Sequence, residues 1–128
     1  MNMIELKRII VKPFDKYRFE VVEDYEFDLN VTKDIIKKGY KTDGASIPRI
    51  FWSLYPPYKS EYFTACVIHD WLCSKSIHEE SIKNAYKLAD LALKEAMLSL
   101  GVSKFTTYTF YYWCKYYHIL KCFLKGYK

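Results

Sequence analysis

The sequence is poor in arginine and lacks long apolar runs. Three of its 128 residues are arginine, against seventeen lysines. Since bidentate recognition of phosphate and guanine relies on arginine, nucleic acid is not an expected partner. No apolar run approaches the roughly 18 residues of a membrane span. Charges at Glu5 and Lys7 interrupt what would be the apolar region of a signal peptide, so we expect a cytoplasmic protein.

Closely spaced cysteine pairs are also missing. The four cysteines, Cys66, Cys73, Cys114 and Cys122, form no CxxC motif. We therefore expect reduced thiols that pack as small hydrophobic side chains. Cys66, His69 and Cys73 share one helical face and would offer three soft ligands to zinc. A cysteine–histidine nucleophile is a further alternative, and a simple core stripe is the plainest interpretation.

What the chain has in abundance is aromatic and basic side chains. It contains 13 tyrosines, 8 phenylalanines and 3 tryptophans, and half of it is hydrophobic. The formal net charge is +5 and the isoelectric point about 8.9. This composition suits one domain with a real core, in which tyrosines lie at the edge of the core or line a cleft.

Hydrophobic periodicity predicts an α+β fold in a single domain, residues 1–128. An N-terminal antiparallel sheet occupies 1–42, a motif-bearing loop 43–59 and a helical part 60–125. Alternation and β-branched content predict the strands at 4–12, 17–23, 25–29 and 35–41.

Three helices are expected after the loop. The first runs over 60–75 with Ser60 as its N-cap, and the second over 77–100 behind a Ser76–Glu79 capping box. The third begins at Ser103 or Thr106 and is aromatic nearly all round up to Leu124. A helix of this kind is either central in the fold or meets a partner.

A polar loop and a His-Asp pair are the main candidates for a site. Asp43, His69 and Asp90 supply the nitrogen and oxygen ligands of a hydrolytic site for a divalent metal, zinc or manganese. Asp70 would act as a base or support a ligand. Helical rise places His69 about 10 Å and Asp90 about 20 Å from the turn near Ser76, so Asp90 is the least secure member.

Each candidate has a structural alternative. Asp43 before Gly44 is typical of an Asx turn, and His69 on an apolar face is typical of a core histidine. Asp90 would then pair with a lysine or with Arg49. Of the remaining histidines, we expect His78 to be exposed in a turn and His118 to lie either in the core or in a cleft.

Three segments together resemble a known family. Gly39–Arg49, with its Thr-Asp-Gly-Ala-Ser-Ile-Pro-Arg core, His69-Asp70-Trp71-Leu72 and Ala89-Asp90 resemble domain of unknown function 1353, found largely in phages and prophages. The resemblance covers about residues 37–100. It implies a phage or prophage origin and a polar signature in which Ser46 and Arg49 join the catalytic candidates. That signature is Asp43, Ser46, Arg49, His69, Asp70 and Asp90. Cys73 departs from the family, which tends to have tyrosine there, and Lys115 stands where arginine is expected.

Three functions compete at this point. The first is a small metal-dependent hydrolase acting on peptidoglycan or a nucleotide signal. The second is a non-enzymatic phage protein that assembles in a virion or binds a host protein, with the polar signature as a structural network. The third is a small-molecule sponge that stacks its ligand on tyrosines.

Overall fold

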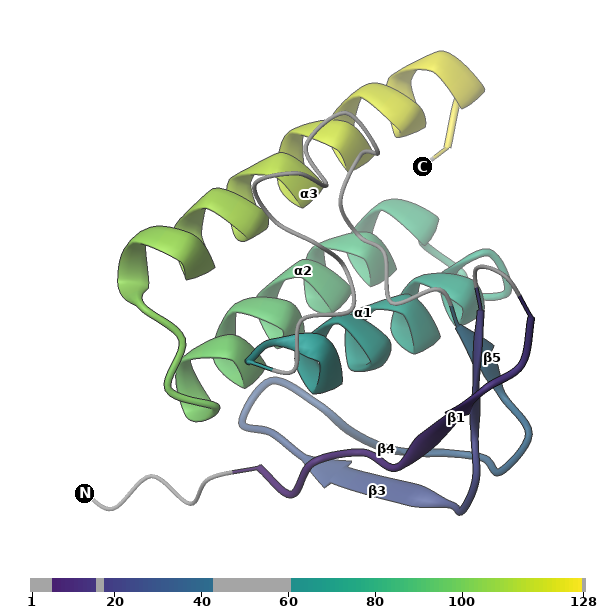
Figure 1. Cartoon of the computed structure of the whole chain (residues 1–128). Coiled ribbons are helices and arrows are strands. Elements are labelled where there is room, and N and C mark those ends of the chain that lie inside the picture. The colour runs from purple at the N-terminus through teal and green to yellow at the C-terminus, as the bar shows by residue number, and fades with distance from the viewer. Residues whose placement is uncertain (1–5, 16–17, 43–60, 128) are drawn as a thin grey trace.

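The chain forms strands first and helices afterwards, as the α+β prediction requires. The computed structural model describes residues 6–15, 18–42 and 61–127 (Figure 1). The bounds of its elements are β1 Val11–Pro13, β2 Phe19–Val21, β3 Tyr25–Asp28, β4 Lys33–Ile36, β5 Lys41–Thr42, α1 Phe63–Ser76, α2 Ile82–Ser99 and α3 Lys104–Lys125.

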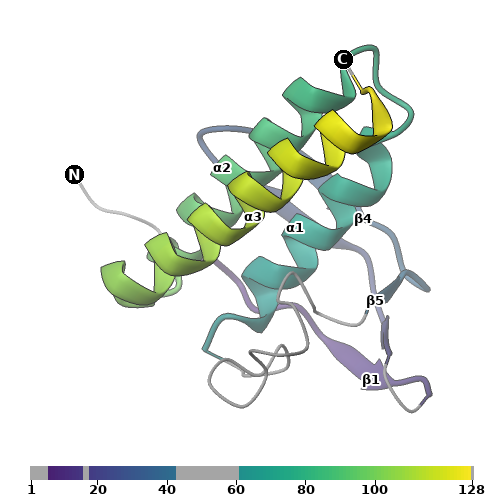
Figure 2. The ribbon, with the colours of Figure 1, turned by 90° about the horizontal axis from the view of Figure 1, so that it is seen from above.

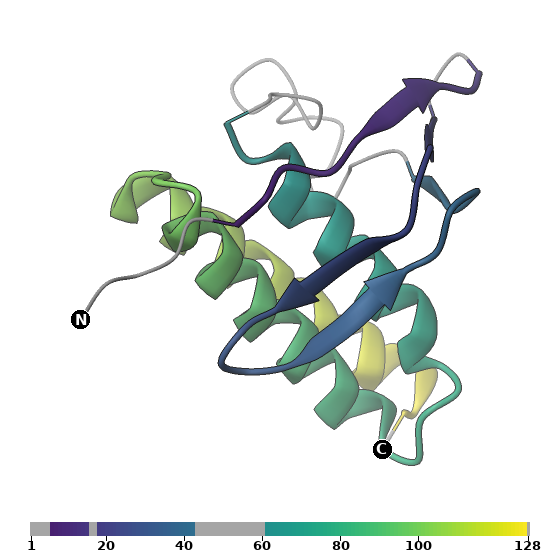
Figure 3. The same cartoon turned by 90° about the horizontal axis from the view of Figure 1, so that it is seen from below.

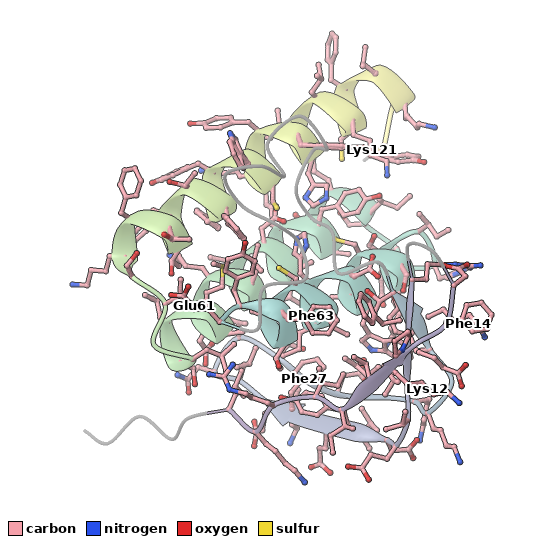
Figure 4. The ribbon with its side chains drawn as sticks, viewed as in Figure 1. Lys12, Phe14, Phe27, Glu61, Phe63 and Lys121 are labelled. Atoms are coloured by element: carbon pink, nitrogen blue, oxygen red, sulfur yellow. The ribbon has the colours of Figure 1, made fainter. Side chains whose placement is uncertain are left out.

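The strands make two small antiparallel sheets. One has the order β1-β2-β5, and the other pairs β3 with β4. In β3, Tyr25 and Phe27 are buried while Glu26 and Asp28 are exposed, which is the alternation expected for a strand with one face on a core. Phe27 lies between β3 and the helices (Figure 4).

Strand lengths differ from those predicted. The predicted strand 4–12 is reduced to β1 among its described residues, with Pro13 as the last paired residue. The predicted strand 35–41 is split, because Gly39 at φ +92° turns the chain between β4 and β5. β4 also begins at Lys33, two residues before the start of the predicted strand.

Helix α1 is the centre of the fold. The strands cover one side of the layer made by α1 and α2, and α3 lies on the other side (Figure 1, Figure 3). As a result the whole stretch 64–69 of α1 is buried, rather than one stripe of it. α2 packs against both other helices, and from above α3 is seen to run over α1 and α2 (Figure 2).

Two helix starts were only partly foreseen. The predicted capping box at Ser76–Glu79 is wrong: 77–81 is a connection, and Ser81 caps α2 by accepting a bond from the Asn84 amide at 3.3 Å. Ser103 caps α3 as predicted, and Gly101 follows α2 at φ +83°. The predicted N-cap Ser60 lies outside the described residues.

Helix α3 is peripheral, and one face of it is exposed. Its buried residues are Thr107, Phe110, Cys114 and Cys122. The central position that its aromatic sequence left open is therefore wrong. Within the described part of the chain, no helix combines the length and the apolarity needed to cross a bilayer.

Candidate metal centre

Four side chains from three helices meet where α3 crosses the α1–α2 layer. His69 and Cys73 are one helical turn apart on α1, Asp90 comes from the middle of α2, and His118 from α3. Because residues four apart lie on the same side of a helix, His69 and Cys73 face the same neighbours. All four therefore converge by helix packing alone.

Asp90 bridges two histidines. Its Oδ1 lies 2.7 Å from His69 Nε2, and its Oδ2 lies 2.9 Å from His118 Nδ1. Asp90 and His69 are each 3% exposed, so water does not compete for these bonds. The carboxylate thereby fixes the orientation of both rings.

Cys73 lies against the same two rings and is itself only partly buried. Its Sγ is 3.5 Å from His69 Nε2 and 3.8 Å from His118 Nε2. The His118 ring consequently has a carboxylate at one nitrogen and a thiol at the other. This is the geometry in which a histidine binds a metal through one nitrogen and is held by a carboxylate through the other.

The electrostatics of the cluster favour a charged Asp90 and a neutral thiol. Burial raises the pKa of the Asp90 carboxyl, but hydrogen bonds from His118 and His69, together with their charge, outweigh it and lower this pKa below its ordinary value. Burial raises the pKa of the Cys73 thiol, and the charges of Asp90 and Asp70 raise it further. Cys73 is therefore a poor nucleophile by itself, which argues against the cysteine–histidine alternative.

One aromatic ring and one lysine border the cluster. The Tyr86 ring stacks on His118 with centroids 4.2 Å apart and planes 2° from parallel. Lys121 Nζ lies 5.3 Å from the centre of the Tyr86 ring and reaches from α3 toward the other helices (Figure 4). Lys121 also lowers the pKa of Cys73, although less than burial raises it.

Two sets of metal-binding atoms exist among the described residues. One consists of His69, Cys73 and His118, and the other of His69, Asp90 and Cys114; in each set the ligand atoms lie within 4.8 Å of one another. The first set is partly accessible, whereas the second is buried throughout. The zinc alternative with Cys66 corresponds to neither set.

The structure brings some of the expected site residues together and separates another. His69 and Asp90 touch, although counting along the helices placed them apart. Asp70 instead accepts a hydrogen bond from the Tyr40 hydroxyl at 2.9 Å, and it makes further interactions. Asp43, Ser46 and Arg49, expected from the loop, lie outside the described residues.

His118 was not among the site residues expected from the sequence, and Cys73 was named only in the zinc alternative with Cys66 and in the cysteine–histidine alternative. One signal was present for His118, since Cys114, His118 and Cys122 recur every four residues on what proves to be the inner face of α3. A histidine within such a stripe needs a polar partner, and Asp90 is the acidic residue of α2 within an apolar run. His78, by contrast, is exposed in the turn as predicted.

Comparison with known proteins identifies relatives of unknown function. The chain is 41% identical over 66 residues to the uncharacterised protein y4jT of Sinorhizobium fredii (strain NBRC 101917 / NGR234), which is 48% of this chain and 20% of the relative. It is 35% identical over 78 residues to y4iH of the same organism, also uncharacterised, which is 60% of this chain and 30% of the relative. The matches thus span less than a third of either relative.

No solved structure matches the chain. The family model described as "Protein of unknown function (DUF1353)" matches residues 19–114. This range contains the loop motif, the His69-Asp70 pair and Asp90, and stops just short of His118. The chain belongs to the DUF1353 family.

Proposed function

We propose that this chain is a metal-dependent hydrolase whose divalent metal is held by His69, Cys73 and His118. The observation that carries the proposal is the placement of His118, whose Nδ1 lies 2.9 Å from Oδ2 of the buried Asp90 while its Nε2 lies 3.8 Å from Cys73 Sγ. A carboxylate behind a metal-binding histidine is the usual arrangement in protein metal sites.

The ligand types favour zinc over magnesium or calcium. Imidazole nitrogen and thiolate sulfur are ligands of zinc and other transition metals, whereas magnesium and calcium take oxygen. Three protein ligands leave a fourth tetrahedral position free, as in catalytic zinc sites. A metal bound there would supply an activated water or polarise a carbonyl or phosphoryl group.

The protein's own residues would have separate tasks. Cys73 would lose its proton on binding the metal, since only the thiolate is a ligand. His69 Nε2 would exchange its bond to Asp90 for the metal, while His118 Nδ1 would stay on Asp90. Tyr86, stacked on His118, would keep that ring from turning.

Lys121 favours a phosphorylated substrate over peptidoglycan. Its Nζ lies 5.3 Å from the centre of the Tyr86 ring, and its charge lowers the pKa of the Cys73 thiol. A nucleotide signal, with its phosphate charges, would be attracted there. A phage or prophage origin remains part of this proposal, supported by the family resemblance.

Elemental analysis of the purified protein tests the metal. We expect about one zinc per chain, retained in His78→Ala and lost in His118→Ala. His78 is a matched control because it is an exposed histidine in a turn. A protein without metal, which also fails to take up zinc after dialysis against it, would contradict the proposal.

Hydrolysis is tested with a chromogenic phosphodiester, bis(p-nitrophenyl) phosphate, on the metal-loaded protein. We expect turnover that disappears in His118→Ala and in chelator-treated protein and persists in His78→Ala. If the protein binds one equivalent of metal but turns over neither this probe, nor a panel of nucleotides, nor peptidoglycan, the hydrolase part of the proposal is contradicted and only metal binding stands.

A structural network is the second candidate. It is favoured by the fact that both Asp90 oxygens have histidine partners. This alternative predicts that His69→Ala and His118→Ala lose stability to a similar degree and that the parent chain binds no metal. Urea denaturation with and without added zinc separates the two, because only a metal site gains stability from zinc.

A further inference from the structure

The outer face of α3 is unusually apolar for a surface helix. Phe123 is 81% exposed, Phe105 76%, Leu124 71% and Tyr116 61%. Tyr108, Tyr112, Ile119 and Leu120 are exposed as well. We call these eight residues the α3 outer face. Single exposed hydrophobic residues are normal, but a continuous set of this size marks an interaction surface.

Helical geometry makes this set continuous. At 3.6 residues per turn, Phe105, Tyr112, Tyr116 and Phe123 fall on one line along the helix. Rings along that line stack on one another, with centroids 6.2 Å apart for Tyr108 and Tyr112 and 6.1 Å apart for Tyr112 and Tyr116. The line extends over nearly all 22 residues of α3, on the side of the molecule away from the strands (Figure 1).

The charge of the chain is concentrated in the same region. From Ala96 to Lys128 there are five lysines and no aspartate or glutamate, whereas residues 1–95 contain equal numbers of basic and acidic residues. The whole net charge of +5 therefore belongs to the C-terminal stretch that contains α3.

Three lysines border the outer face along one of its sides without interrupting it. Lys104 and Lys115 lie about a quarter turn from the line through Phe105 and Phe123. Lys115 Nζ is 5.8 Å from the centre of the Tyr112 ring, and Lys94 of α2 is 5.5 Å from that of Tyr108. An apolar outward face bordered by cations is the pattern of helices that lie in the surface of a bilayer.

We propose that α3 docks on an anionic lipid surface, with its axis in the plane of the membrane. Phe105, Phe123 and Leu124 would enter the boundary between head groups and acyl chains. The flanking lysines would meet the negative head groups, and the tyrosines would sit at the polar level that suits their hydroxyls.

Charge argues against the other occupants. A two-fold dimer through this face would place two helices that carry lysines and no acidic residue against each other. A nucleic acid would suit the lysines and tyrosines, but the aliphatic Ile119, Leu120 and Leu124 offer it no stacking surface. A lipid surface accepts both the aliphatic and the cationic side chains.

Vesicle sedimentation of the full chain tests the proposal. We expect binding to phosphatidylcholine vesicles that contain about 30% phosphatidylglycerol, and about tenfold weaker binding to vesicles of phosphatidylcholine alone. High salt should weaken the binding to the anionic vesicles. Equal binding to both kinds of vesicle, or binding to neither, would overturn the proposal.

Paired variants locate the docking face. Phe123→Ser and Lys115→Gln should each weaken binding to the anionic vesicles, the first by about tenfold or more. Ile77→Ser and Lys33→Gln, at exposed positions outside α3, should bind like the parent chain. If Ile77→Ser weakens binding as much as Phe123→Ser does, α3 is not the docking face. A parent chain that is dimeric without lipid, and becomes monomeric in Phe123→Ser, would likewise overturn the proposal.

Discussion

His69 Nε2 lies 2.7 Å from Asp90 Oδ1, across 21 residues of sequence. The contact exists because α1 ends at Ser76 while α2 begins only at Ile82. His69 is thus roughly 10 Å back from the end of α1, and Asp90 roughly 12 Å into α2. Because the two distances are similar, the five-residue connection places His69 and Asp90 side by side on the two helices.

Asp90 is expected to be the most sensitive polar residue for stability. Asp90→Ala leaves two histidines without their acceptor in a buried site, which should lower the free energy of unfolding by about 3–5 kcal/mol. Urea denaturation monitored by circular dichroism measures this. Asp28→Ala, at an exposed strand position, should stay within about 0.5 kcal/mol of the parent chain. Equal losses in the two variants would show that Asp90 has no special role.

Tyr25 makes folding sensitive to alkaline pH. Burial raises the pKa of its hydroxyl to about 12, and this hydroxyl donates to the Lys7 carbonyl. Because the folded pKa is raised, the protonated form stabilises the fold fully below the ordinary tyrosine pKa, near 10, and this stability is lost as pH rises toward 12. Stability measured from pH 9 to 12 should fall less steeply in Tyr25→Phe than in the parent chain; the same slope in both would contradict this assignment.

Glu95 connects α2 to the β3–β4 turn. Its two carboxylate oxygens accept bonds from the Asn30 amide at 2.7 Å and the Val31 amide at 3.1 Å. Glu95→Ala should therefore cost about 1–2 kcal/mol of unfolding free energy. Hydrogen exchange should show faster exchange at these two amides, with little change at the Val21 amide, which bonds to the Tyr40 carbonyl instead. Unchanged exchange at Asn30 and Val31 would refute the connection.

Asp34 is a titratable group in contact with Trp71, whose fluorescence can report its protonation. It accepts a bond from Trp71 Nε1 at 3.1 Å and pairs with Lys75. Burial raises the pKa of Asp34, but bonds from Lys75, the Ile35 amide and Trp71 lower it overall. The Asp34–Lys75 pair is partly exposed, so it stabilises the fold only modestly. This stabilisation is present above the ordinary pKa of aspartate and is lost as pH falls through the lowered pKa of Asp34. Tryptophan emission should change over this acid range, and Asp34→Asn should remove most of that change; an identical acid titration in the variant would exclude Asp34 as its source.

Local patterns predicted the elements but not their exact limits. Tyr25–Asp28 alternates cleanly, and Ser103 and Gly101 mark helix ends, because these signals depend on neighbouring residues alone. The capping box at Ser76 failed since Ser81 offers the same hydroxyl to α2 one turn later. No local signal decides between two such caps.

The site was harder to foresee than the fold. His69 and Asp90 could be named from their apolar surroundings, but their contact depends on where α2 begins. His118 could be recognised only once the inner face of α3 was known, because the sequence places aromatic residues on every side of that helix. The exposed outer face could not be predicted for the same reason. Apolar residues lie on both sides of α3, so the sequence does not indicate which side is buried.

Substitution of cobalt(II) tests the central claim most directly, since cobalt bound to a cysteine thiolate gives a charge-transfer band in the near ultraviolet. With the metal held by His69, Cys73 and His118, the band appears with one equivalent of cobalt and is lost in Cys73→Ser. It stays in Cys114→Ser, which removes the sulfur of the buried alternative set, and in Cys122→Ser. Loss in Cys114→Ser alone, or no band in the parent chain, would contradict the account.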